Sequence, residues 1–390
     1  MWRQTAAIDR FLASEMTNDE SPRRSQSRRY IVLIVLVALL FGGWSAFWVV
    51  ATGKARDMLE GWRAREAKAG RTFTCGQEDF GGYPFRFEFR CTDAAAQIRS
   101  SRIPFDAKVK GVTVVSQVYQ PTLLIGEYQG PLTLSPPGGA TELTMNWKQF
   151  QSSLRGTPAR PERLSLVFER PAIDVVDNGN SRPALRAADL EVHGRLVEGL
   201  VTDKPVIEVA LRTTGAFAPG VRALSAQPVD AVVDMVFRGL NDFAPKPWPE
   251  RFQEIAANGG KIDITEARLV QGETLATGSG TLTISAAGRL QGQLRLTVAG
   301  LEAFLKAIDA QNLVQASPSM DKLATALDRF SPGLGQAAKQ QVGANLSAGI
   351  NMLGQQTTLE GRPAVSLPLR VEEGRVFLGP IPVGEAPPLF

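Results

Sequence analysis

The sequence predicts a β-rich α+β protein, in which a single N-terminal transmembrane helix precedes an extended, curved antiparallel β-sheet with a few packed helices. Three observations support this fold class. An apolar stretch at residues 30–51 contains no charged residue. Alternating apolar and polar residues recur in short segments over most of the remaining chain, as expected for strands with one face buried. Helical periodicity is confined to a few stretches between those segments.

The uncharged stretch has the length of a membrane span. As an α-helix it rises about 33 Å, enough to cross a hydrocarbon core of about 30 Å. Trp44, Phe47 and Trp48 gather near one end, where amphipathic rings favour the headgroup level. A secretory signal has a shorter apolar core of about 7–15 residues, so we expect an uncleaved anchor. Small residues at Ala51 and Gly53 leave cleavage open.

The span divides the chain into four predicted parts. These are a cytoplasmic tail (1–29), the transmembrane helix (30–52), a juxtamembrane helix (53–70) and a β-rich envelope domain (71–390) with a possible sub-boundary near 240–248. Four arginines at 23, 24, 28 and 29 precede the span, but five basic residues also follow it. Because long domains translocate largely regardless of charge, we expect the N-terminus in the cytoplasm. Met1 and Met16 are both candidate start residues.

Composition excludes one class of partner. The chain has 390 residues, of which 43 are Lys or Arg and 39 are Asp or Glu, so its charge is nearly balanced. No stripe of basic residues is visible in the sequence. Because nucleic-acid binding depends on such a stripe, we expect no nucleic-acid partner.

The juxtamembrane residues predict a helix with one apolar face. Ala55, Met58, Leu59 and Trp62 follow the i, i+3, i+4, i+7 spacing. We expect this face to pack on the first strands rather than to lie on the headgroups.

The period then changes to two in the segment FRFEFRC. Phe85, Phe87 and Phe89 point to one side with Cys91, and these three rings form a candidate apolar face. Arg86, Glu88 and Arg90 point to the other side, which is predicted to be wet. The preceding FGGYP is a turn signal.

The two cysteines predict a disulfide. A hairpin around FGGYP brings Cys75 near Cys91, and such a bond persists in an oxidising compartment outside the cytoplasm. The alternative is two buried free thiols in a cytosolic protein. A metal site is improbable, because two cysteines and the distant His193 do not make a four-ligand set.

The remaining pattern is strand after strand, with helices late in the chain. A helix is expected at 246–258, where Pro249 suits the first turn and Gly259-Gly260 follows. Others are expected from 301, around 320–330 and at 334–345. Strands are expected at Val112–Tyr119, Thr122–Ile125, Leu164–Phe168, Ile173–Val176, Leu185–Val192, Val206–Leu211, Val232–Phe237, Lys261–Leu269, Thr281–Ile284, Leu290–Val298, 365–371 and Val376–Leu378.

Familiar catalytic patterns are missing from the sequence. His193 is the single histidine, and its alternation with Val192 and Leu190 places it on the solvent face of a strand. Gly278-Ser279-Gly280 lacks the third glycine of a dinucleotide site, and Glu372-Glu373 reads as a solvated turn. We therefore expect no enzyme, no cofactor and no metal.

Three segments carry a family resemblance. They are FGGYPFRFEFRC (Phe80–Cys91), GTLTISAAGRLQGQLRLTVAGL (Gly280–Leu301) and FLGPIPVGEAPPL (Phe377–Leu389). With the N-terminal anchor they resemble the bacterial domain-of-unknown-function family 2125, over nearly all of the chain after the anchor. The style of strands and turns is also similar to AsmA-type envelope proteins. That similarity implies an anchored protein with a long β-sheet, acting in outer-membrane and lipid homeostasis. Neither resemblance assigns a functional residue.

Together these observations predict a single-pass inner-membrane protein with a periplasmic C-terminal domain. The leading hypothesis is a non-enzymatic protein whose sheet offers an apolar groove to lipid or another amphiphile. The alternative is a structural scaffold or protein-interaction module of the cell envelope, without a ligand. A groove requires apolar residues on strands that no helix covers, whereas a scaffold buries them all.

Overall fold

The computed structural model describes residues 24–100, 104–139, 141–157, 160–221, 227–243, 246–307, 354–378 and 381–390, with a few single residues between 324 and 336. The chain divides into two compact units, Met1–Asp57 and Met58–Phe390. Each unit is described by itself below.

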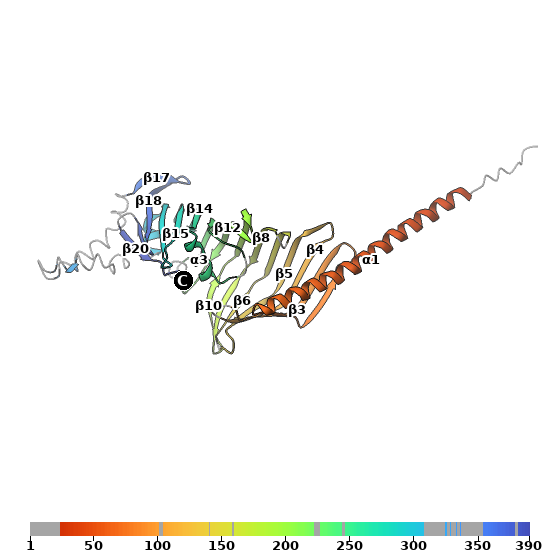
Figure 1. The fold of residues 1–390 in the computed structure, drawn as a ribbon. Coiled ribbons are helices and arrows are strands. Elements are labelled where there is room, and N and C mark those ends of the chain that lie inside the picture. Colours follow the sequence, from red (N-terminus) through yellow and green to blue (C-terminus); the bar gives the residue numbers. More distant parts are fainter. Residues whose placement is uncertain are drawn as a thin grey trace, which may run out of the picture. The chain divides into compact units, whose positions relative to one another are not determined.

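A single helix, α1 (Arg24–Lys68), contains the whole uncharged stretch (Figure 1). It is long and apolar enough to cross a membrane, with a mean hydropathy of 2.4 over its most apolar window. Two hydroxyls within it are satisfied by the helix itself: Ser45 donates to the carbonyl of Phe41, and Thr52 to that of Trp48. Such internal pairing is required of polar groups in lipid.

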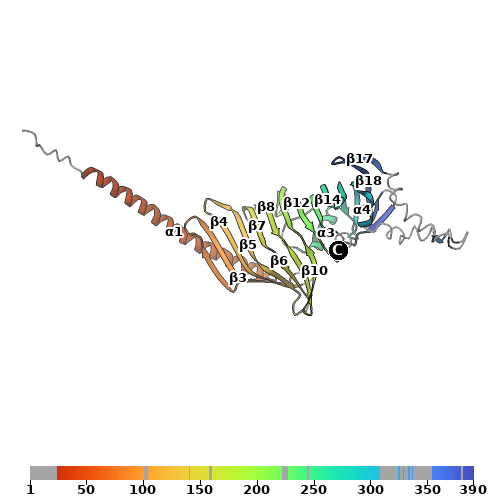
Figure 2. The same cartoon turned by 180° about the vertical axis from the view of Figure 1, so that it is seen from behind.

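The described residues of the second unit form one antiparallel sheet of 20 strands (Figures 1 and 2). The sequence therefore predicted the β-rich class and the antiparallel sheet correctly. The strands are β1 (Arg71–Thr74), β2 (Gln77–Gly81), β3 (Arg86–Ile98), β4 (Phe105–Gln117), β5 (Gln120–Ser135), β6 (Thr141–Asn146), β7 (Gln149–Thr157), β8 (Arg160–Glu169), β9 (Ala172–Asp177), β10 (Asn180–Arg186), β11 (Asp189–Leu200), β12 (Asp203–Ala216), β13 (Val229–Arg238), β14 (Lys261–Gln271), β15 (Thr274–Ile284), β16 (Leu290–Ala299), β17 (Gln355–Leu359), β18 (Arg362–Glu372), β19 (Arg375–Leu378) and β20 (Ile381–Glu385).

Neighbours in the sheet follow the chain almost everywhere, as in a meander. The order runs β3, β4, β5, β7, β8, β11, β12, β13, β14, β15, β16 and β18. Both β1 and β2 pair with β3, while β17 and β19 both pair with β18, and β20 pairs with β19. Local hairpins therefore build most of the sheet.

A line of irregularities crosses the early strands. Strand β5 pairs with β7 before Gly130-Pro131 and with β6 after it. Three further pairs of consecutive strands are each interrupted by two residues at the same level of the sheet. The interruptions are Trp147-Lys148 between β6 and β7, Arg170-Pro171 between β8 and β9, and Ala187-Ala188 between β10 and β11. Each strand thus carries extra residues at the same level, as at a β-bulge, where strands bend.

These breaks explain two differences from the predicted strands. The run Leu185–Val192 is split between β10 and β11, because the amide of Ala187 donates to Pro171 and that of Ala188 to Thr214. Strands β6 and β7 lie in the region predicted as strand after strand, but their bounds were not predicted, since their sequences TELTMN and QFQSSLRGT contain few β-branched apolar residues.

Two helices cover the later strands. Helix α3 (Trp248–Ala257) begins after Pro247 and ends before Gly259, which has a φ of 58°, as predicted. Helix α4 (Leu301–Ala307) confirms the predicted helix from residue 301. Ile308 and nearly all residues of the helices expected at 320–330 and 334–345 lie outside the described residues.

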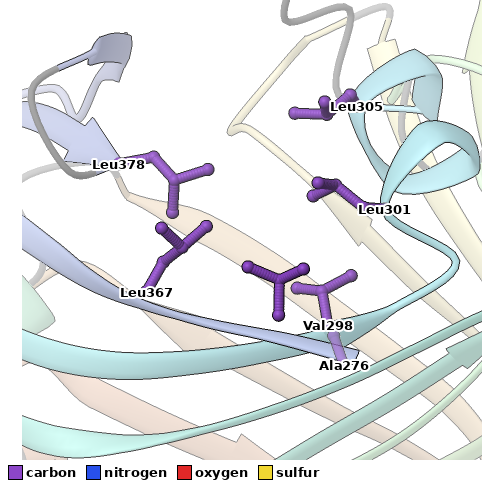
Figure 3. Close-up of a cluster of buried hydrophobic side chains, with 7 residues drawn as sticks. Ala276, Val298, Leu301, Leu305, Leu367 and Leu378 are labelled. Carbon is purple, nitrogen blue, oxygen red and sulfur yellow. The ribbon is translucent and has the colours of Figure 1, made fainter. Parts of the chain in front are cut away.

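The buried core lies beneath these helices. Under α4, Leu301 and Leu305 contact a cluster of side chains from β15, β16, β18 and β19: Ala276, Val298, Val365, Leu367 and Leu378 (Figure 3). Under α3, Ile255 is 1% exposed and packs with Ile207, Ile262 and Ile284. Leu389 and Phe390 also pack against this second cluster.

Candidate functional site

The strand register sorts the side chains of the sheet onto two faces, because directly opposed residues in an antiparallel pair point the same way. Three rows on one face define what we call the apolar face. The first row is Val114, Gly126, Ser152, Leu166, Val192, Leu211 and Val233; the second is Val112, Tyr128, Phe150, Phe168 and Leu190; the third is Leu124, Leu154, Leu164, Gly194, Val209 and Met235. The rows continue from strand to strand without a change of face.

The opposite face of the same strands is largely polar. One of its rows is Thr113, Glu127, Gln151, Val167, Glu191 and Arg212. His193 lies on this face, half-buried, with its Nε2 2.9 Å from a carboxylate oxygen of Glu191. Arg195 pairs with Glu208 across β11 and β12. The sheet is therefore amphipathic across its early strands.

The apolar face is covered unevenly. Among the described residues, the buried clusters around Val298 and Ile255 continue this face and lie on β12 to β19 and on the segments that pack there, whereas the cluster around Leu275 lies on the opposite face. From β4 to β11, every large apolar side chain of the face stays partly exposed. Leu124 is 38% exposed and Leu164 is 40% exposed. This part of the face has the character that a groove for apolar ligands requires.

A stack of aromatic rings lies at the middle of the exposed part. The ring of Phe150 stacks on Tyr128 at 4.2 Å and on Phe168 at 3.9 Å, between ring centres. Trp147 meets Phe150 edge-on at 5.4 Å, and its indole N–H donates to the carbonyl of Tyr128. A side chain at Gly126 would come within 2.5 Å of the Ser152 hydroxyl. Glycine there leaves room for the bond between that hydroxyl and Tyr128, which spans 3.0 Å.

Of the three rings predicted to share one face, two lie on the first long strand and one lies in the turn before it. Phe87 and Phe89 lie on β3, opposite Ser116 and Val114, and both are partly exposed. Phe89 contacts the ring of Phe80 at 5.0 Å. Phe85 does not belong to the strand, contrary to the alternation: it lies in the turn between β2 and β3 and is 70% exposed. The turn is closed by the Arg86 amide, which donates to Gly82.

The opposite side of β3 also corrects a prediction. Glu88 was expected to be wet, but it is only 5% exposed. Arg86 pairs with one of its carboxylate oxygens at 2.8 Å, and Arg90 pairs with the other. The two arginine stems cover the carboxylate, since a long charged side chain shields what lies beside it.

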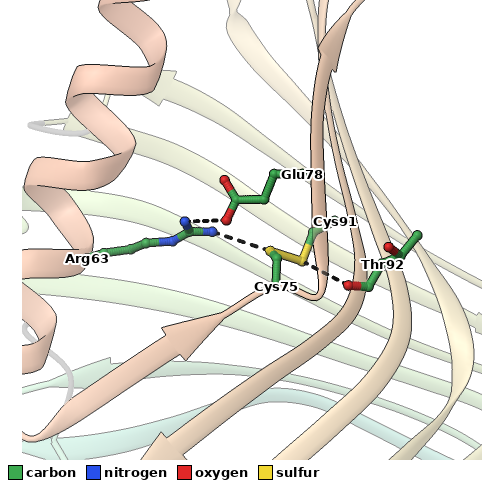
Figure 4. The surroundings of a disulfide bond; sticks show 5 residues. All are labelled: Arg63, Cys75, Glu78, Cys91 and Thr92. Carbon is green, nitrogen blue, oxygen red and sulfur yellow. Dashed lines mark hydrogen bonds and ion pairs between the residues drawn. A yellow bond between two sulfur atoms is a disulfide. The ribbon is translucent and has the colours of Figure 1, made fainter.

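The predicted disulfide is confirmed, between Cys75 and Cys91 with their Cα atoms 5.5 Å apart (Figure 4). Cys75 lies between β1 and β2, where the run expected as one strand breaks. Opposite this break Asp93 has a φ of 49°, and the amide of Gly76 donates to Thr92. The disulfide thus links the break between β1 and β2 covalently to β3, the strand with which both of them pair.

The end of α1 packs on these first strands, as predicted. The ring of Trp62 stacks on Phe73 at 4.8 Å. Arg63 pairs with Glu78 and donates to the Sγ of Cys75 (Figure 4). Met58, expected on the same helix face, is 69% exposed.

Other candidate sites are less developed. A cavity of about 620 Å³ is lined by Arg295, Thr297, Ser366 and residues 355–359 of β17, and these hold no acid–base pair. Glu372 ends β18 and Glu373 lies in the following turn, at a φ of 47°. Within the described ranges, no three His, Cys, Asp or Glu side chains gather as metal ligands would.

A family model described as "Uncharacterized protein conserved in bacteria (DUF2125)" matches residues 48–387. No curated protein matches the chain.

Proposed function

We propose that this chain, which belongs to DUF2125, a family of uncharacterized proteins conserved in bacteria, is a non-enzymatic envelope protein that holds a lipid or another amphiphile on its apolar face. In this proposal α1 anchors the chain in the inner membrane, with the N-terminus in the cytoplasm and the sheet in the periplasm. The observation that carries the proposal is the unbroken apolar face of β4 to β11, whose large side chains remain partly exposed.

The dimensions of the face suit an acyl chain. From β4 to β11 the sheet crosses four strand spacings, about 19 Å in all. Along one strand, three apolar residues in alternation span about 13 Å. The hydrocarbon of one bilayer leaflet is about 15 Å thick, half of the core. An acyl chain extended across the strands therefore fits within the face.

The line of irregularities supplies a reason for curvature. Bulges increase local twist and bend strands, and here they occur at one level on several neighbouring strands. We propose that the sheet curves along this line.

The disulfide supports the location. Disulfides persist in oxidising compartments such as the bacterial periplasm, and the bond joins the first strands after the anchor. This favours a periplasmic sheet over a cytoplasmic one.

Two residues of one strand provide a matched test. Leu164 and Val167 both lie on β8 with similar exposure, 40% and 38%, but on opposite faces. The full chain would be purified from membranes, and bound amphiphile measured by native mass spectrometry and by lipid extraction. We expect Leu164→Asp to lose most of the bound amphiphile and Val167→Asp to keep it. Lipid around α1 is common to both variants and cancels.

Two results would count against the proposal. Equal amphiphile in the wild type and both variants would place the ligand elsewhere. A wild-type protein that carries no amphiphile, with Leu164→Asp as stable as Val167→Asp, would favour the scaffold alternative.

A further inference from the structure

Two neighbouring turns at one end of the first strands present exposed aromatic rings. Phe85, in the turn between β2 and β3, is 70% exposed, and Tyr119, in the turn between β4 and β5, is 77% exposed. The turns are adjacent, because the amide of Val118 donates to the carbonyl of Phe85 at 3.0 Å. Tyr83 in the first turn is 42% exposed. We call Tyr83, Phe85 and Tyr119 the aromatic tip.

The last turns of α1, from Met58 to Lys68, run alongside β1 and β2 in the opposite direction. Glu66, near the end of the helix, pairs with Arg71 at the start of β1. Arg63, one turn earlier in the helix, pairs with Glu78 on β2, which is further along the chain. Strand β2 continues from Glu78 to Gly81, next to the tip, while the helix continues from Arg63 back to Met58. Within this unit, Met58 and the aromatic tip therefore lie at the same end.

The apolar segment of α1 lies a short way upstream along the chain. In a helix, Ala51 precedes Met58 by a rise of about 10 Å. The headgroup layer outside the hydrocarbon is about 5–8 Å thick on each side. The short chain from Ala51 to Met58 therefore keeps Met58 within reach of the headgroups of a bilayer that holds residues 30–51.

Aromatic rings are suited to that depth. Tyrosine and tryptophan gather at membrane interfaces because one part of the ring is apolar and the other polar. A single exposed ring is ordinary, but exposed aromatic rings gathered at two adjacent turns mark a surface suited to contact with a membrane. Strand β5 also begins at the tip and carries Leu124, one of the exposed residues of the apolar face.

We propose that the aromatic tip rests in the headgroup layer of the membrane that α1 enters, and that it joins this membrane to the apolar face. The inference rests on the part of the proposed function that makes α1 a membrane anchor. It does not depend on amphiphile being held on the sheet.

Photocrosslinking tests the contact directly. The full chain would be reconstituted in vesicles of phosphatidylethanolamine and phosphatidylglycerol, with p-benzoylphenylalanine in place of Phe85, Tyr119, Trp248 or Phe47, one at a time. Phe47 lies in the uncharged segment and serves as the positive control. Trp248 is the matched control, because it is an aromatic residue of similar exposure, 65%, that lies on α3 and not at the tip. Lipid adducts would be counted by mass spectrometry.

We expect lipid adducts at 85, 119 and 47, and several-fold fewer at 248. Adducts at 47 without any at 85 and 119 would overturn the inference. Equal adducts at 85, 119 and 248 would also overturn it, since contact would then not be specific to the tip. The same substitution at Leu164 separates this inference from the proposed function. Adducts at 85 and 119 without one at 164 support tip contact alone, and the reverse pattern supports binding on the sheet while excluding the tip.

Discussion

The guanidinium of Arg63 donates a hydrogen bond to the Sγ of Cys75 across 3.3 Å, so the last turns of α1 are joined to the disulfide of the first strands. Arg63 also pairs with Glu78 on β2. Helix, disulfide and strand therefore meet at one point. The last turns of α1 are thus held against the first strands by contacts that include the disulfide.

Removing the disulfide is expected to destabilise the sheet unit. The bond closes a loop between residues 16 apart, and replacing both cysteines by serine should cost about 2–4 kcal/mol of unfolding free energy. Denaturant unfolding under non-reducing conditions measures this. Arg63→Ala keeps the disulfide and should cost less than about 1 kcal/mol. Full thiol labelling of unreduced, denatured protein taken from the envelope would contradict the bond.

The aromatic stack is expected to contribute more than its partial burial suggests. Phe150 lies between the rings of Tyr128 and Phe168, so Phe150→Ala removes two ring contacts at once. We expect a loss of about 2–4 kcal/mol. Val167→Ala on the polar face of β8 should cost less than about 1 kcal/mol. Thermal and denaturant unfolding of both variants compares them, and equal losses would show that the stack contributes nothing specific.

The buried carboxylate of Glu88 should depend on its two arginines together. Either Arg86→Ala or Arg90→Ala leaves one ion pair intact and should cost little. Removing both leaves a buried charge without a counterion, which we expect to cost about 3–5 kcal/mol. Adding Glu88→Ala to the double variant should restore part of the loss. A purely additive result in the mutant cycle would mean that Glu88 does not couple the pair.

The stability that the ion pairs of Glu254 contribute to α3 is expected to decrease in acid. Burial alone would raise the pKa of Glu254, but the amide of Asn241, the ammonium of Lys246 and the guanidinium of Arg251 together hold that pKa below its ordinary value. Arg251 lies 3.1 Å from the carboxylate and Lys246 lies 3.3 Å from it. The folded state binds this proton less readily than the unfolded state, so the contribution is present above the unfolded pKa and is lost as the pH falls through the folded one.

Glu254→Gln tests that sign. We expect the variant to lose about 1–3 kcal/mol at pH 7, and the difference from wild type to shrink as the pH falls below about 4.5. Unfolding free energies measured at pH 7, 5, 4 and 3 would show this trend. A difference that stays constant over the range would mean that the charge of Glu254 does not stabilise α3.

The proposed topology predicts opposite behaviour of two reporters. A reporter active only outside the cytoplasm, fused after Phe390, should be active, because α1 crosses the membrane once. A reporter active only in the cytoplasm should be silent at the same position. The reverse pattern would place the sheet inside the cell and remove the oxidising compartment for Cys75 and Cys91.

Local patterns predicted the elements better than their relations. Strands with strict alternation, such as Leu290–Val298, and the helix after Pro247 occur where expected, because side-chain period follows backbone type. The bounds of β6 and β7 could not be predicted, because their polar sequences form strands only through pairing with neighbouring strands. The exposure of Phe85 could not be predicted either, since a turn ends an alternating pattern without changing its composition.

The sequence by itself determined the apolar helix, the succession of strands and the pairing of Cys75 with Cys91. These depend on hydrophobic length, on period and on the nearness of two residues along the chain. Only the tertiary structure decided that rows from β4 to β12 form one apolar face, that Glu88 is buried between two arginines, and that Met58 and the aromatic tip lie at the same end of the first strands. The physical reason is register. A shift of one residue in any strand would turn its side chains to the other face, and register is set by the geometry of the turns and bulges between and within the strands.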